Sequence, residues 1–247
     1  MNLTENTILI TGGNAGIGQA LAVALHEAGN QVIIAGRNEK TLKETATAHE
    51  GMAYELADMQ DASAINTFAE RMVSKYPALN VLINNAGIMI AEDILSGSGN
   101  LADAEAMVAT NLLGPIRLTT ALLPHLLKQS SATIMTVSSG LAFVPLAATP
   151  TYNATKAAIH SYSQSLRYQL RNTSVEILEL APPAVATNLM PGHKANPNSM
   201  PLDAYISEVM ELLKTAKTEI LVDRVKFLRN AESSGGYDKV FGILNPA

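Results

Sequence analysis

Short apolar runs alternate along this chain with longer amphipathic ones, and this alternation restricts the possible folds more than any other feature. Apolar runs of this length indicate buried strands, and the amphipathic runs indicate helices. Strands are expected at residues 7–11, 31–35, 81–84, 133–138 and 176–180, and helices at residues 16–28, 39–49, 103–128 and 152–172. Because strands that are separated by helices pair in parallel, both faces of the sheet are expected to carry helices.

The length of the chain allows one domain of this α/β kind. With 247 residues, of which 47% are hydrophobic and 16% charged, the chain can bury one large core. We predict a single domain over residues 1–247, a doubly wound parallel sheet of the Rossmann type, with the ligand at the carboxyl ends of its strands. Proline, glycine and asparagine cluster between Pro191 and Pro201, which predicts a substrate lid around residues 188–215.

Charge and composition exclude several kinds of partner. The 17 basic residues do not outnumber the 22 acidic ones and form no dense run, so neither nucleic acid nor an anionic membrane surface is expected to bind. The absence of cysteine excludes disulfides and thiolate catalysis, and no two of the five histidines have metal-ligand spacing, so no metal is expected. The N-terminus has no basic region followed by an apolar run, and we expect a cytoplasmic protein that binds a small molecule.

A glycine-rich turn follows the first expected strand and opens the first expected helix. It reads Thr-Gly-Gly-Asn-Ala-Gly-Ile-Gly from Thr11 to Gly18. Glycine lets the backbone approach a phosphate closely, and a helix N-terminus offers free N–H groups and the positive end of the helix dipole. The residues expected to bind a dinucleotide in this turn are Gly12, Asn14, Ala15, Gly16, Ile17 and Gly18. A turn that only packs a strand closely against a helix could have the same composition, so both interpretations stay open.

The most specific pattern is Ser139 followed by Tyr152 and Lys156. A tyrosine and a lysine four residues apart on a helix share one face, so the ammonium group can reach the phenol. A phenol titrates near pH ~10, and a neighbouring positive charge lowers that pKa towards the range useful for acid–base catalysis. Ser139 can donate a hydrogen bond to a carbonyl oxygen on which negative charge develops. Taken alone, the Tyr–Lys pair is common on ordinary helices.

Two further elements stand between the glycine turn and Ser139. The run Asn84-Asn85-Ala86-Gly87 ends an expected strand, and Asn111 lies within an expected helix, where its poor helix propensity needs a reason. A helix kink or a satisfied buried amide would supply one. Together and in this order, the glycine spacing, the Asn-Asn-Ala-Gly run, Asn111, the serine and the Tyr–Lys pair resemble the short-chain dehydrogenase/reductase (SDR) family.

This resemblance covers the chain from about residue 7 to residue 189 and implies an oxidoreductase. It implies hydride transfer to or from the C4 atom of a nicotinamide, with Tyr152 protonating the forming alkoxide and Lys156 also holding the nicotinamide ribose. It implies that Asn111 completes a proton relay and that Asn85, Ala86 and Gly87 shape the nucleotide pocket. The segments around Ser139, Pro124 and Pro183 resemble the bacterial DltE-type subgroup, which does not identify a substrate.

The end of the second expected strand bears on the choice of cofactor. NAD enzymes usually place a carboxylate there, but this chain has Gly36 followed by Arg37, whose guanidinium suits a 2′-phosphate. We therefore predict NADP(H) as the preferred cofactor, with NAD(H) possible and a plain surface arginine as the alternative reading. By resemblance Asp58 contacts the adenine, although a helix N-cap would explain it as well. Val185 and Thr187 match positions that contact the nicotinamide amide and the phosphate, after a turn in which Pro183 replaces the usual glycine.

Apolar residues are expected around the substrate. Segment 143–148 and the residues Met89, Ile90, Leu189 and Met190 predict an apolar pocket for a hydrophobic carbonyl or alcohol, unless these residues mainly pack on one another or on the cofactor. The alternatives to this reading are an NAD-preferring dehydrogenase of the same fold and a non-enzymatic NADP-sensing protein. The filled catalytic set disfavours the sensor.

The resemblance also implies a homodimer or homotetramer. The two long expected helices, 103–128 and 152–172, are the ones through which related proteins pair. Apolar residues such as Leu112, Ile116, Leu122 and Leu126 are expected to cover both the sheet and a partner. The amphipathic C-terminal segment 221–247 is expected to pack near the substrate entrance.

Overall fold

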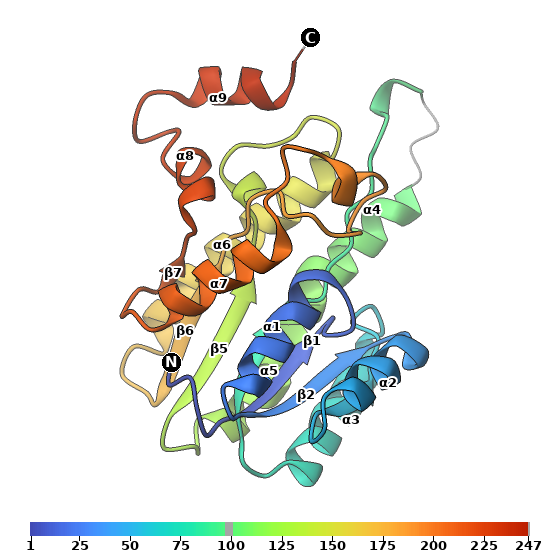
Figure 1. Cartoon of the computed structure of the whole chain (residues 1–247), viewed down its shortest axis with the longest axis vertical. Helices are drawn as coiled ribbons and strands as arrows, with labels where there is room; N and C mark the ends of the chain where they lie inside the picture. Colours follow the sequence, from blue (N-terminus) through green and yellow to red (C-terminus); the bar gives the residue numbers. More distant parts are fainter. Residues whose placement is uncertain (97–100, 247) are drawn as a thin grey trace.

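The computed structural model describes residues 1–96 and 101–246, and its centre is a seven-stranded parallel sheet (Figure 1). The strands pair in the order β3-β2-β1-β4-β5-β6-β7. Their bounds are β1 Thr7–Thr11, β2 Gln31–Gly36, β3 Ala53–Leu56, β4 Leu79–Asn84, β5 Ala132–Val137, β6 Val175–Leu180 and β7 Glu219–Ile220. The strand order reverses between β1 and β4, which confirms the predicted doubly wound Rossmann-type sheet.

Helices cover both faces of this sheet because neighbouring strand residues point to opposite sides. In β1, Ile8 and Ile10 join an apolar cluster with α1, α2 and α7, whereas Leu9 joins a second cluster with α3, α5 and α6. Figure 1 shows α1 and α7 in front of the strands. The helices on the first face are α1 Gly16–Glu27, α2 Glu39–Ala48 and α7 Leu202–Leu213, and those on the second face are α3 Ala62–Lys75, α5 Gly114–Leu126 and α6 Pro150–Gln169.

The long helix predicted at residues 103–128 is interrupted. It consists of α4 Leu101–Val108, a π-helical turn Ala109–Leu113 and α5, and Asn111 lies within the turn. The whole run is long and apolar enough to cross a membrane by length and composition. Leu118, Leu122 and Leu126 are nevertheless fully buried against the sheet and α3, so the apolar face of α5 belongs to the core.

Strands β3 and β7 and helix α3 lie outside the segments that the sequence pattern identified. Strand β3 is partly exposed at the edge of the sheet, so it lacks the continuous apolar run of the central strands. Helix α3 begins at the N-cap Asp61, whose carboxylate accepts hydrogen bonds from the backbone N–H groups of Ser63 and Ala64. Strand β7 comprises only two residues.

The range predicted as a lid, 188–215, divides into two parts. Its second part includes α7, in which Tyr205 and Val209 are fully buried in the core beside α1. Its first part belongs to a loop whose two ends meet, because Val185 forms a bridge with Met200 and the Ala186 N–H donates to the Met200 carbonyl at 2.9 Å. Helix α7 cannot move without opening the core, so a lid role could belong only to the loop within the range 188–215, and that role stays a prediction.

The C-terminal segment contains α8 Lys226–Arg229 and α9 Tyr237–Leu244, and α9 lies beyond the carboxyl ends of the strands in Figure 1. Asn245 connects this segment to the chain between Ser139 and Tyr152. Its side-chain oxygen accepts from the Ala147 N–H at 2.6 Å, and its amide nitrogen donates to the Pro145 carbonyl at 3.1 Å. The segment therefore packs on the part of the chain from which we expect the substrate pocket to be built.

Candidate active site

The loops that follow β1 and β4 meet at the point where the strand order reverses. The Thr11 hydroxyl accepts from the backbone N–H groups of Asn85 at 3.1 Å and Ala86 at 3.0 Å. The Asn85 amide nitrogen donates to the Thr11 carbonyl at 2.9 Å and to the Gly12 carbonyl at 3.3 Å. The structure thus brings the glycine turn and the Asn-Asn-Ala-Gly run to one edge of the sheet, where α/β proteins of this topology bind their ligands.

Different physical constraints require glycine at different positions of the turn. Gly12 and Gly16 have φ of +67° and +53°, which only glycine adopts readily, while a Cβ on Gly18 would overlap the Asn85 amide. Gly16 also faces Thr187, whose Cβ would lie 3.4 Å from an added Cβ. Close packing therefore explains part of the motif. The first turn of α1 has no side-chain cap at Ala15, so its N–H groups remain able to bind an anion, as a dinucleotide site needs.

Ser139, Tyr152 and Lys156 come together at the carboxyl end of β5. All three side chains are at least nine-tenths buried. The Lys156 Nζ atom lies 5.6 Å from the centre of the Tyr152 ring and donates to the Val137 carbonyl at 2.7 Å, and the Ser139 hydroxyl is hydrogen-bonded to the Tyr152 phenol. The α6 spacing and the loop after β5 therefore produce the arrangement that the sequence predicts.

Burial dominates the acid–base properties of this group. It raises the pKa of Tyr152 to about 12, and the hydrogen bond with Ser139 offsets only part of that rise. Burial also lowers the pKa of Lys156 to about 8. From the sequence, the ammonium is predicted to lower the pKa of the tyrosine below its usual value. In the structure of the chain by itself the result is the reverse, because the cost of burying a phenolate exceeds the attraction of a lysine that is itself buried.

Asn111 is satisfied by the backbone and stands beside the lysine. Its Oδ1 atom accepts from the Ile88 N–H at 2.9 Å, and its Nδ2 atom donates to the Ile88 carbonyl at 2.9 Å and to the Thr155 hydroxyl at 3.2 Å. A Cβ on Gly87 would lie 3.5 Å from Asn111 Oδ1 and 3.7 Å from Lys156 Nζ. Both of the plain reasons for this residue hold, a helix irregularity and a satisfied amide, and its role in a proton relay stays a prediction.

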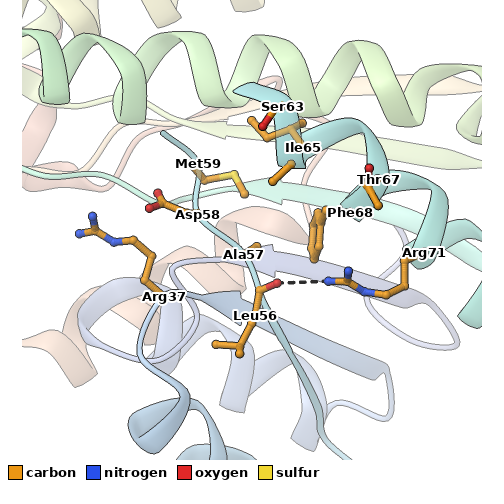
Figure 2. Close-up of a pocket in the computed structure, with 11 residues that line it drawn as sticks. Arg37, Leu56, Ala57, Asp58, Met59, Ser63, Ile65, Thr67, Phe68 and Arg71 are labelled. Carbon is orange, nitrogen blue, oxygen red and sulfur yellow. Dashed lines mark hydrogen bonds between the residues drawn. The ribbon is translucent and has the colours of Figure 1, made fainter. Parts of the chain in front are cut away.

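A pocket of about 670 Å³ lies beyond the carboxyl ends of β2 and β3, next to α3. Figure 2 shows Arg37 and Asp58 on one side of it and Arg71 on the other, where the Arg71 guanidinium donates to the Leu56 carbonyl at 3.2 Å. The remaining labelled lining is apolar or hydroxylic. The N-cap reading of Asp58 is wrong because Asp61 caps α3, and the Asp58 carboxylate accepts instead from the Gln60 N–H at 2.9 Å.

Val185 and Thr187 enter the site from the loop after β6. Val185 is buried in the core, and Thr187 faces Gly16 across the glycine turn. This placement is compatible with contact to a nicotinamide nucleotide. The residues expected to bind dinucleotide therefore line one continuous edge from Arg37 to Lys156.

The structure adds residues that no local pattern identifies. Glu92 caps the helix that carries the tyrosine, since its carboxylate accepts from the Thr151 N–H and hydroxyl, each at 2.8 Å. His160, Glu179 and Glu219 come from three elements, and their possible ligand atoms lie within 4.8 Å of one another. These three residues lie far apart in the sequence, so only long-range pairing assembles them, and the absence of a bound metal stays a prediction.

Comparison with known proteins agrees with this geometry. A family model described as short chain dehydrogenase matches residues 6–198. A Bacillus subtilis (strain 168) protein described as uncharacterized oxidoreductase DltE is 42% identical over 99% of this chain and 98% of its own length.

Solved structures show the same fold. A Burkholderia cenocepacia J2315 short chain dehydrogenase in complex with NADP matches with a TM-score of 0.84 at 20% identity, covering 100% of both chains. A Brucella melitensis 3-ketoacyl-(acyl-carrier-protein) reductase complexed with NADH matches with a TM-score of 0.80 at 21% identity, covering 91% of this chain and 100% of the other.

Proposed function

The chain belongs to the short-chain dehydrogenase/reductase family and is an NAD(P)-dependent oxidoreductase of the DltE type, and from this premise we propose that it interconverts an apolar carbonyl compound and its alcohol with NADP(H). The observation that carries the proposal is the convergence of Ser139, Tyr152, Lys156 and Asn111 at one edge of the sheet. These side chains come from three separate segments, and a binding protein would have no need of an acid–base set.

Ser139, Tyr152 and Lys156 have distinct tasks in the proposed reduction. A nicotinamide nucleotide held at this edge of the sheet would supply the hydride for the carbonyl carbon. The Ser139 hydroxyl donates a hydrogen bond to the carbonyl oxygen, and the Tyr152 phenol donates its proton to that oxygen as negative charge develops on it. The high pKa of Tyr152 keeps this proton in place at neutral pH, and Lys156, with a pKa of about 8, is the neighbouring group that can return a proton to the phenolate.

The choice of NADP(H) rests on two neighbouring positions at the end of β2. A Cβ on Gly36 would lie 2.7 Å from the Asn14 side-chain oxygen, and Asn14 is held there by a 2.8 Å hydrogen bond to the Thr41 hydroxyl. A side chain at this position would therefore have to displace Asn14 from this hydrogen bond, which disfavours a carboxylate for the ribose hydroxyl. Arg37 is exposed and lines the pocket of Figure 2, where its guanidinium suits a phosphate.

Replacing Arg37→Ala should weaken NADPH binding about 10-fold and leave NADH binding within about 2-fold, because one exposed charge-assisted contact contributes about 1.5 kcal/mol. Titration followed by the fluorescence of the reduced nucleotide measures both values without interference, since the chain contains no tryptophan. Arg71→Ala is the matched control from the other side of the pocket. An equal loss for both nucleotides in Arg37→Ala would contradict the proposed preference for NADP(H).

The walls beside Tyr152 support an apolar substrate. Tyr152 forms an apolar cluster with the buried residues Met89 and Met107, and partly buried apolar side chains pack against this cluster: Ile88, Ile90, Leu141, Leu146 and Met190. Not every residue expected at the substrate rim belongs to this cluster. Val144 is fully buried in the main core, and the Phe143 ring packs edge-on against His160 with 4.9 Å between ring centres.

A substrate panel tests the proposed reaction. We expect NADPH-dependent reduction of medium-chain aldehydes and aromatic ketones, followed as loss of nicotinamide absorbance, with little turnover of charged sugars of similar size. Tight NADPH binding without turnover of any carbonyl or alcohol would favour the sensor instead. Failure to bind either nucleotide would overturn the proposed function.

We further propose that the chain pairs through the face formed by α4, α5 and α6. A shallow hollow of about 400 Å³ on this face is lined mainly by apolar residues, among them Ile94, Val108, Leu112 and Pro150. Leu122 and Leu126 do not contribute, because the core buries both completely. Light scattering should give a dimer or tetramer at micromolar concentration, and Leu112→Glu should shift it towards monomer. A monomeric wild-type protein would contradict this expectation.

A further inference from the structure

A buried carboxylate lies directly behind the catalytic residues. Glu179 on β6 is 1% exposed, and its Oε1 atom accepts from the Ser138 hydroxyl at 2.5 Å. The Nδ1 atom of His160 lies 2.8 Å from Oε2 and 3.0 Å from Oε1 of the same carboxylate. A buried charge is costly unless its oxygens are paired, so these two partners are strongly held.

The two partners of Glu179 belong to the two segments that carry the catalytic set. Ser138 stands between Val137, whose carbonyl accepts from Lys156 Nζ, and the catalytic Ser139. His160 follows Lys156 by four residues on α6, so it occupies the same face of the helix one turn further along. The Glu179 carboxylate therefore joins the end of β5 to α6, next to Ser139 on the first and one helical turn from Lys156 on the second.

The neighbours of His160 select one tautomer of its imidazole ring. The Gln164 side-chain nitrogen lies 3.1 Å from His160 Nε2 and can only donate, which makes Nε2 the acceptor and leaves Nδ1 to donate to Glu179. The Phe143 ring packs on the His160 imidazole. The guanidinium carbon of Arg229 lies 4.9 Å from the centre of the Phe143 ring. Arg229 also pairs with Glu219 through two hydrogen bonds, of 2.9 and 3.3 Å.

This pairing bears on the metal-like grouping of His160, Glu179 and Glu219. Arg229 already provides a positive charge for Glu219, and the imidazole and a serine hydroxyl already donate to Glu179. The group is satisfied by protein donors, and its geometry is that of hydrogen bonds. These hydrogen bonds favour a positioning role for Glu179 and His160.

We propose that Glu179 and His160 are positioning residues that set the separation between Ser139 on one side and Tyr152 and Lys156 on the other. Displacing reacting groups by about 1 Å can cost about 100-fold in rate, so a rigid tie at this point has a large effect on turnover. Neither residue lines the pocket that contains Arg37, so the contacts expected of Arg37 with the nucleotide do not depend on the tie, and most of the nucleotide affinity should remain. This inference rests on the proposed oxidoreductase function.

The test compares variants that break the tie with one that keeps it. In Glu179→Leu, which removes both acceptor oxygens, and in His160→Leu we expect kcat to fall 10- to 100-fold while the Kd for NADPH stays within about 2-fold. His160→Asn should retain most of kcat, because its side-chain amide can donate from nearly the position of Nδ1. Glu176→Gln is the matched control on β6, since Glu176 is half-exposed and pairs with the N-terminal amine of Met1.

The double variant Glu179→Leu/His160→Leu should lose no more than the worse single variant, because both changes break one link. Crystal structures of the single variants without nucleotide provide a readout besides turnover, and we expect the Lys156–Val137 hydrogen bond to lengthen or break. If wild-type protein shows no turnover but this bond is still lost, the proposed function fails and the positioning role stands.

Three results would overturn the inference. The first is an unchanged kcat in both tie-breaking variants. The second is a parallel loss of kcat, NADPH affinity and melting temperature, which would mean general destabilisation. The third is a rise in melting temperature with added zinc chloride that disappears in His160→Leu, which would identify a metal site.

Discussion

Tyr152→Phe should lower kcat at least about 1,000-fold while the Kd for NADPH changes less than about 3-fold. The substitution removes one hydroxyl from a side chain that is already packed among Met89 and Met107, so the shape of the pocket is kept. The proton that the developing alkoxide needs is lost, and a positioned general acid contributes about 100- to 10,000-fold. Steady-state kinetics with the best substrate of the panel, and nucleotide titration, measure the two effects.

Tyr162→Phe is the matched control for this experiment. Tyr162 lies on the same helix, ten residues after Tyr152, and packs against the core cluster that α3, α5 and α6 form on their face of the sheet, away from Met89 and Met107. It should keep wild-type kcat and NADPH affinity. If Tyr152→Phe retains substantial turnover, the proton comes from another group and our assignment of the acid is wrong.

Lys156→Met should abolish most turnover and yet raise the stability of the folded chain near pH 7. Burial lowers the pKa of Lys156 from 10.5 to about 8, so carrying the charge into the fold costs about 3 kcal/mol below pH 8. Methionine avoids this cost, but it leaves the Val137 carbonyl without its side-chain donor. That loss lowers the stability of the variant by about 1–2 kcal/mol. We expect a net gain of about 1–2 kcal/mol and a melting temperature higher by about 3–6 °C.

The stability difference between Lys156→Met and the wild type should decrease as the pH rises. Below pH 8 the lysine is charged in both the folded and the unfolded chain, so the full cost applies to the wild type. Between pH 8 and 10.5 the folded chain loses the proton first, and the wild type becomes more stable relative to the variant. Thermal melts from pH 7 to pH 10 should therefore show the advantage of Lys156→Met shrinking. A constant or growing advantage would contradict the lowered pKa.

The catalytic grouping was predictable because its signals are local. Tyr152 and Lys156 face the same way because of the helical repeat, and the residues after β1, β4 and β5 converge because parallel strands end at one edge of the sheet. The same reasoning failed where burial is incomplete or elements are short. Strand β3 lies partly exposed at the sheet edge and has no continuous apolar run, and the cap of α3 is Asp61 because the helix starts three residues later than an Asp58 cap requires.

By itself the sequence determined the fold class, the family, and which side chains stand at the edge of the sheet, because spacing along helices and strands depends on near neighbours. Only the tertiary structure decided how deeply those side chains are buried and which groups they contact. The opposite pKa shifts of Tyr152 and Lys156 follow from burial by α6, the β5 loop and the chain around Met89, which no short segment encodes. The tie from Glu179 to Ser138 and His160 likewise joins residues 41 and 19 positions apart, and it exists only because β6 pairs with β5 under α6.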